Sequence, residues 1–98
     1  MKITKTKNGS AMEVAIIGRL DTESAPELHE ALQDDVNDLD SLTMDFAELD
    51  YISSAGLREL LKLKRGMRMG GELTVKNASE IVREVFNVTG FNKLITVA

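Results

Sequence analysis

The sequence predicts an α/β fold in which strands and helices alternate along one chain of 98 residues. Two patterns support this prediction: apolar and polar residues alternate in short segments, and apolar residues recur at helical spacing in the longer segments between them. The expected order of elements is β-β-α-β-α-β-α-β. This alternation implies parallel strands joined by helical crossovers, and an opening hairpin adds one antiparallel pair. We therefore expect one domain over residues 1–98 with a small mixed sheet.

The chain begins with a predicted hairpin. Its strands are Ile3–Lys7 and Met12–Ile17, and the turn between them, Asn8-Gly9-Ser10, contains an Asn-Gly pair that tolerates positive φ. The first helix should follow, because Ser24-Ala25-Pro26-Glu27 fits a capping box with glutamate three residues after the serine. The residues expected on its buried side are Leu28, Leu32, Val36 and Leu39.

The second part of the chain continues the alternation. A third strand is expected at Leu42–Phe46, a second helix at Ala55–Met69 with Gly70 as its stop, and a short strand at Leu73–Val75. Ser79 can cap a third helix that Thr89-Gly90 ends, and Leu94–Val97 could form a last strand. The apolar stripe of the third helix comprises Ile81, Val82, Val85, Phe86 and Val88.

The composition is that of a globular protein and excludes several function classes. The chain has no cysteine, so disulfides and thiolate ligands are excluded, and no apolar run is long enough to cross a bilayer. The first residues lack the apolar core of a secretory signal. We therefore expect a cytoplasmic location without membrane insertion. The net charge of −4 argues against nucleic acid as a partner.

Charge is segregated between two predicted helices, for which solvated helix faces are the simpler explanation. The acidic residues of the first helical region are Glu23, Glu27, Glu30, Asp34, Asp35, Asp38 and Asp40, and the basic residues of the second are Arg58, Lys62, Lys64, Arg65 and Arg68.

The sequence gives little support to catalysis or metal binding. His29 is the only histidine, and we expect it to be solvated on the first helix. The sequence therefore predicts neither an enzyme nor a cofactor.

The segment Ser53-Ser54-Ala55-Gly56-Leu57 is the most informative one, because small residues and a hydroxyl stand where the second helix begins. Ser54 is expected at or near the N-cap, where a helix supplies unpaired N–H groups and partial positive charge. A plain cap is the commoner role, and a phosphorylated serine is the functional alternative. At about 100° per residue, Ser54 lies opposite the apolar side, nearly in line with Arg65 and close to Arg58. Gly56 should face the sheet as a packing residue.

Four segments carry a family resemblance. They are Gly18-Arg19-Leu20-Asp21, Met44-Asp45-Phe46, Ile52-Ser53-Ser54-Ala55-Gly56-Leu57 and Val85-Phe86-Asn87-Val88-Thr89-Gly90-Phe91. Through them the chain resembles the STAS domain, the family of bacterial anti-sigma factor antagonists, over essentially its whole length. The resemblance implies a small mixed sheet with helices packed largely on one face.

The resemblance also implies a function. An antagonist of this family binds an anti-sigma factor, often a serine kinase of the GHKL ATPase type, and so frees a sigma factor. The kinase phosphorylates a residue two before the glycine, here Ser54, and a phosphatase reverses this step. Ser53 replaces the usual aspartate and is the alternative acceptor. The partner-binding residues implied are Asp21, Ser53, Ser54, Ala55, Gly56, Arg58 and Lys62.

A second role stays open. The chain could be a STAS subunit that is not switched, bound to the ATPase of a lipid transporter or built into a signalling assembly. Ser53 in place of the usual aspartate leaves this alternative open, whereas the presence of Ser54 favours the antagonist. Use of Ser54 as a catalytic nucleophile has the least support, because no base stands beside it.

Overall fold

The computed structural model describes all 98 residues, which form six strands and three α-helices with the segments that connect them. Two short 3-10 helices, Val36–Asp38 and Phe91–Lys93, lie between them. The predicted α/β class with a mixed sheet is confirmed. The elements in chain order are β1 (Lys2–Asn8), β2 (Ala11–Leu20), α1 (Ala25–Leu32), β3 (Ser41–Asp45), β4 (Leu49–Ile52), α2 (Ser54–Gly66), β5 (Glu72–Lys76), α3 (Glu80–Thr89) and β6 (Thr96–Val97).

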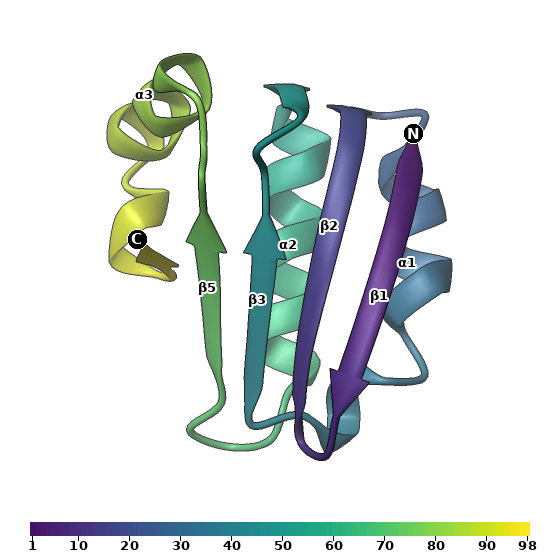
Figure 1. The fold of residues 1–98 in the computed structure, drawn as a ribbon. Coiled ribbons are helices and arrows are strands. Elements are labelled where there is room, and N and C mark those ends of the chain that lie inside the picture. The colour runs from purple at the N-terminus through teal and green to yellow at the C-terminus, as the bar shows by residue number, and fades with distance from the viewer.

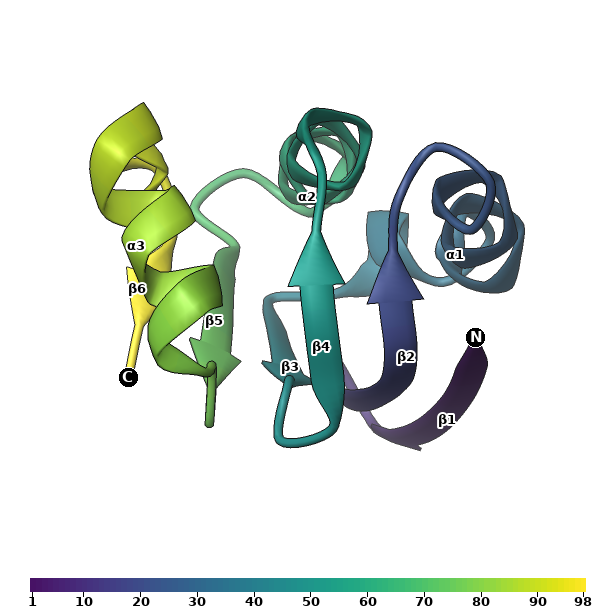
Figure 2. The same ribbon diagram turned by 90° about the horizontal axis from the view of Figure 1, so that it is seen from above.

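The strands form one sheet in the order β1-β2-β3-β5-β6, with β4 paired separately to β2. Strand β1 is antiparallel to β2, and the remaining neighbours are parallel. Helices α1 and α2 lie side by side on one face of the sheet, and α3 lies at its β5 end (Figures 1 and 2). This arrangement agrees with helices packed largely on one face.

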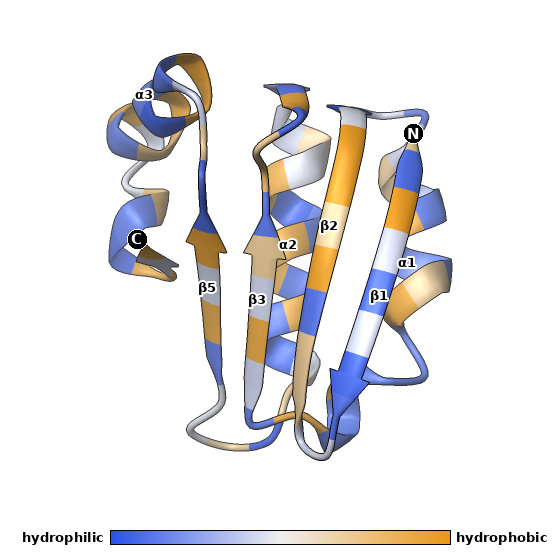
Figure 3. Ribbon diagram, viewed as in Figure 1, coloured by the Kyte–Doolittle hydropathy of each residue, from blue (hydrophilic) through white to orange (hydrophobic).

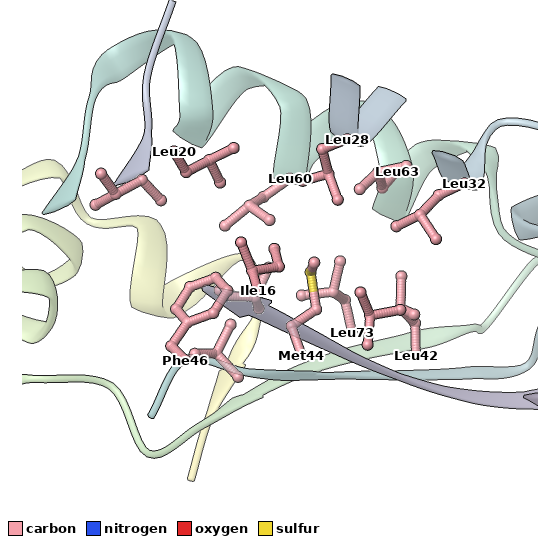
Figure 4. Close-up of a cluster of buried hydrophobic side chains, with 14 of the residues drawn as sticks. Ile16, Leu20, Leu28, Leu32, Leu42, Met44, Phe46, Leu60, Leu63 and Leu73 are labelled. Atoms are coloured by element: carbon pink, nitrogen blue, oxygen red, sulfur yellow. The ribbon is translucent and has the colours of Figure 1, made fainter. Parts of the chain in front are cut away.

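The core lies between the sheet and helices α1 and α2. Along β2, the buried Met12, Val14 and Ile16 alternate with less buried residues, a pattern visible as changing hydropathy in Figure 3. Leucines from the helices, among them Leu60, meet Ile16 and the other strand residues (Figure 4). Twenty-four buried apolar residues form a single cluster. This continuous core joins the sheet to helices α1 and α2 and thereby positions the start of α2 beside the strands.

Strand β4 is the element that the sequence pattern does not predict. Of its four residues only Leu49 and Ile52, at the two ends, are buried, so it lacks the alternation of a strand. It forms because β2 changes partner: Ala11–Ala15 lies beside β3, and Gly18–Leu20 lies beside β4, with a register shift between Gly18 and Arg19. The chain is thereby returned to the end of β2 immediately before α2 begins.

The capping box expected at α1 is wrong. The Ser24 hydroxyl makes no cap hydrogen bond and instead donates to the carbonyl oxygen of Arg19 at 2.6 Å. The Asp21 carboxylate orders this turn, because its Oδ1 accepts from the backbone N–H groups of Glu23 and Ser24 at 3.0 and 3.1 Å. Helix α1 ends early, at Leu32. The expected apolar residues are nevertheless all buried: Leu28, Leu32, Val36 and Leu39.

Helix α2 is also shorter than expected. It ends at Gly66, and Met67 leaves it with an extended backbone whose side chain stays in the core. Gly70 therefore does not stop the helix; it occupies the following turn with a φ of 81°. Met69, expected in the last turn, lies outside the helix and is fully exposed.

The predicted cap of α3 is confirmed, since the Ser79 side chain accepts a hydrogen bond from the Val82 N–H at 3.2 Å. The predicted stripe is partly wrong, because Ile81 and Val88 are 67% and 76% exposed. Only one side of α3 faces the core at this end of the sheet, so Val82 and Phe86 are its buried residues. The last strand is shorter than expected and comprises Thr96 and Val97 alone.

Candidate functional site

The start of α2 lies where β2 and β4 end together. Leu20 and Ile52 are partners in neighbouring strands, and the Ser53 N–H donates to the Leu20 carbonyl at 2.9 Å. Ser53 itself is the N-cap, because its hydroxyl accepts from the Gly56 N–H at 3.3 Å. Ser54, expected at or near the N-cap, is the next residue, and its hydroxyl makes no capping hydrogen bond.

Ser54 is the first residue of α2 and is exposed. The exposed side of the helix also carries Arg58, Lys62 and Arg65, whereas Leu57, Leu60 and Leu63 point into the core. The predicted separation of these two sides is confirmed. The Ser54 hydroxyl is thus presented to solvent at the positive end of a helix, with cationic side chains further along the same side.

Gly56 is buried in the first turn and lies against the sheet, as expected. A Cβ atom at this position would stand 2.7 Å from the Leu20 carbonyl oxygen and 2.9 Å from side-chain carbons of Leu20 and Ile52. These distances are below van der Waals contact. The absence of a side chain therefore lets α2 approach β2 and β4 closely enough for Ser53 to make its hydrogen bonds.

Asp21 lies beside this junction and has a local structural role. The hydrogen bond from the Ser24 backbone N–H is the main cause that holds the pKa of Asp21 below its ordinary value of 3.8. Further contributions come from the Ser24 hydroxyl, the Glu23 N–H and Arg19, whose Nε lies 3.5 Å from Asp21 Oδ2. Asp21 therefore holds the loop between β2 and α1 in shape beside the start of α2.

The charge of Asp21 gives an expected acid dependence. Because folding lowers its pKa, the carboxylate stabilises the fold above the unfolded value, and this contribution disappears as the pH falls through the lowered pKa. Asp21→Asn should melt below wild type at neutral pH, and the gap should close as the pH falls below 3.8 through the lowered pKa of Asp21. Thermal melts across this range test it. Asp50→Asn, at an exposed residue, is the matched control. A gap that persists at low pH would contradict the role of the charge.

Arg19 and Tyr51 form a pair that sequence reasoning missed. They are partners in β2 and β4, and the Arg19 guanidinium lies 4.6 Å from the centre of the Tyr51 ring. Both residues are exposed, and arginine and tyrosine are over-represented among the residues that dominate binding at protein interfaces. The sequence does not predict this pair because Tyr51 belongs to β4, the strand that the residue pattern does not indicate.

A groove of about 380 Å³ runs between the first turns of α1 and α2. The structure brings three of the predicted partner-binding residues into it, Ala55, Arg58 and Lys62, and places residues of α1 opposite them. Ala55, the residue after Ser54, places the groove next to the start of α2. The residues of α1 and the preceding loop that line it are Thr22, Ala25, Pro26, His29 and Glu30.

His29 is not simply solvated, which corrects the expectation. Its Nδ1 lies 2.9 Å from Oε2 of Glu59, a side chain that is almost completely buried under the groove. This contact links α1 to α2 and satisfies a carboxylate that burial would otherwise leave without a partner. No group of three histidine, cysteine, aspartate or glutamate side chains in the chain could hold a metal ion.

Comparison with known proteins places the chain among relatives of similar sequence. The family model described as "Mlab, STAS domain" matches residues 3–96. The chain is 34% identical over 100 residues to BtrV of Bordetella bronchiseptica, whose name assigns it provisionally to the anti-sigma factor antagonists. That alignment covers 100% of this chain and 86% of BtrV. Identity to the anti-sigma-B factor antagonist of Bacillus subtilis is 29%, over 94% of this chain and 85% of the relative.

The fold is similar to solved structures of the antagonist SpoIIAA. The unphosphorylated form superposes with a TM-score of 0.85 at 18% identity, covering 99% of this chain and 88% of that one. A phosphorylated form from Bacillus gives a TM-score of 0.76 at 17% identity, covering 99% and 91%. None of the helices is long and apolar enough to span a membrane. The chain belongs to the STAS domain family, of the type represented by anti-sigma factor antagonists.

Proposed function

We propose that this protein is an anti-sigma factor antagonist whose binding is switched by phosphorylation of Ser54. In its unmodified form it binds an anti-sigma factor, a serine kinase of the GHKL ATPase type, and thereby releases a sigma factor. The kinase inactivates the antagonist, and a phosphatase restores it. The protein acts in the cytoplasm as a regulatory binding protein and not as an enzyme. One observation carries the proposal: Ser54, at the start of α2, is exposed and does not cap the helix, in a chain related to proteins named as antagonists.

Ser54 is a better acceptor than Ser53. The Ser53 hydroxyl is half-buried and accepts the cap hydrogen bond from Gly56, so its modification would remove that bond. The Ser54 hydroxyl is exposed and has no part in the cap. Phosphorylation of Ser54 therefore leaves the first turn of α2 intact.

The fold tolerates the modification, whereas a docked partner does not. A phosphoserine adds roughly −1.5 to −2 charges, which the helix N-terminus and Arg58, one turn along, accommodate in the free protein. A partner packed over the same position would bury these charges away from water, which is unfavourable. The switch therefore acts on binding and not on folding.

The seven candidate partner-binding residues divide into two kinds. Ala55, Arg58 and Lys62 line the groove between α1 and α2. Together with Ser54, the exposed first residue of α2, they contact the partner directly. The other three hold this surface in shape: Asp21 by ordering the loop before α1, Ser53 by capping α2, and Gly56 by close packing.

A phosphorylation assay by intact mass tests the proposal. The protein is incubated with ATP and the serine-kinase anti-sigma factors of its own source, beside Ser54→Ala and Ser53→Ala variants. We expect a gain of one phosphate in wild type and Ser53→Ala, and none in Ser54→Ala. A gain that persists in Ser54→Ala would move the site. No gain with any kinase would favour the unswitched STAS subunit, for which transporter components would be sought by pull-down.

A further inference from the structure

A second cavity lies at the opposite end of α2 from Ser54, roughly 20 Å away along the helix. It has a volume of about 480 Å³, within the range of small-molecule sites. Its walls are the last turn of α2, the turn that leads into β5, the start of β5, and the segment from Lys93 to Thr96. The turn between α2 and β5 is at the bottom of Figure 1.

The cavity is positively charged in a protein that is negative overall. Four cationic side chains line it, Lys64, Arg65, Arg68 and Lys93, against a single carboxylate, Glu72. The chain as a whole has a net charge of −4, so the remaining surface is strongly acidic. The C-terminus of α2 contributes only about half a negative charge here, which is too little to neutralise four cations.

Two of these cations have no partner in the protein. Arg68 lies 3.7 Å from Asp40, and Lys64 donates a hydrogen bond to the Gly71 carbonyl at 3.2 Å. Arg65 and Lys93 make no ion pair or hydrogen bond through their side chains and stand on different elements, one in α2 and the other after α3. An anion in the cavity would be the first counter-charge for both.

The backbone leaves one wall of the cavity open. Gly70, with a φ of 81°, is the third residue of a turn closed by the Gly71 N–H and the Arg68 carbonyl at 2.8 Å. A Cβ atom at Gly70 would have no atom within 4 Å. A ligand can therefore approach the main chain here without meeting a side chain.

We propose that this cavity binds a small molecule that carries two linked phosphate groups or an equivalent pair of anionic groups. Two groups are needed because the unpartnered cations stand on different elements, so that one anion pairs with Arg65 on α2 and the other with Lys93 in the 3-10 helix after α3. Hydrogen bonds between charged partners are the stronger kind in proteins, and a ligand with two phosphate groups can make them to both cations, which gives it a preference over an anion with a single phosphate group. The cavity is separate from the Ser54 surface, and the proposal does not depend on phosphorylation there.

Titration with inorganic pyrophosphate at constant ionic strength tests this site. We expect amide NMR shifts at Gly70, Gly71 and Leu94, and tighter binding of pyrophosphate than of inorganic phosphate. Arg65→Gln and Lys93→Gln should each weaken pyrophosphate binding about tenfold. Lys2→Gln, an exposed lysine on β1 with the same loss of charge, should bind as wild type.

Three results would overturn the proposal. The first is no shift around the cavity, and the second is an equal loss in Lys2→Gln, which would mean a response to overall charge. The third is phosphate binding as tight as pyrophosphate binding, which would remove the argument for two groups. Circular dichroism on each variant verifies that the fold is retained.

Discussion

Ser54→Asp should weaken binding of the anti-sigma factor roughly a hundredfold, which corresponds to about 3 kcal/mol. The exposed side chain is the first of α2, so a partner docked there would have to bury the new carboxylate without a counter-charge. The fold should be unaffected or slightly more stable, because a negative charge at a helix N-terminus is favourable by about 0.3–1 kcal/mol. Calorimetry with the partner identified by the phosphorylation assay measures the first effect, and thermal melting measures the second.

Two controls isolate the position and the charge. Ser54→Asn has nearly the shape of Ser54→Asp without its charge and should bind close to wild type. Asn37→Asp adds the same charge at an exposed residue of the 3-10 helix after α1, away from the start of α2, and should also leave binding unchanged. If Ser54→Asp binds the partner as tightly as these two variants, phosphorylation of Ser54 is not the switch.

Gly56→Val should destabilise the protein by about 4 kcal/mol or more, a large part of the stability of a small domain. A valine Cβ would overlap the Leu20 carbonyl oxygen at 2.7 Å, and backbone atoms of a central strand move less easily than side chains. The same Cβ would also stand 2.9 Å from side-chain carbons of Leu20 and Ile52. We expect the melting temperature to fall by about 15 °C or more, measured by circular dichroism.

Alanine substitutions in α2 provide the matched comparison. Gly56→Ala and Gly66→Ala gain the same helix propensity, up to about 1 kcal/mol. At Gly66 a Cβ would meet only a Val36 methyl carbon at 3.2 Å, so Gly66→Ala should be near neutral or stabilising. Gly56→Ala should be destabilising because the overlap with Leu20 outweighs the propensity. An unchanged melting temperature for Gly56→Val would show that α2 does not depend on this close approach.

The alternative role as an unswitched subunit makes different demands on the same surface. Such a subunit needs the groove between α1 and α2 but not a modifiable hydroxyl. Ser54→Ala would then bind its partner normally and also behave normally in cells. For the switched antagonist, Ser54→Ala binds normally but stays active when the kinase is present. The two roles are thus separated by the response to the kinase and not by affinity alone.

Several features could be predicted from the sequence because they depend on near neighbours in the chain. Alternation identified β2, β3 and β5, and helical spacing identified the buried side of α2 and the exposure of Ser54. The Ser79 cap was recognisable for the same reason, since its hydrogen bond spans three residues. The class of fold followed from the order of these elements.

Contacts between residues far apart in the chain were decided only by the tertiary structure. β4 exists because β2 changes partner at Gly18, and this pairing aligns Tyr51 with Arg19 beside the start of α2. The contact between His29 and Glu59 depends on how α1 packs against α2.

The exposure of Ile81 and Val88 likewise depends on where α3 lies. A residue pattern records which side of an element is apolar, but not which partner covers it or how far that cover extends. The sequence by itself therefore determined all the main elements except β4, and the candidate serine, whereas long-range packing determined β4 and the surface around that serine.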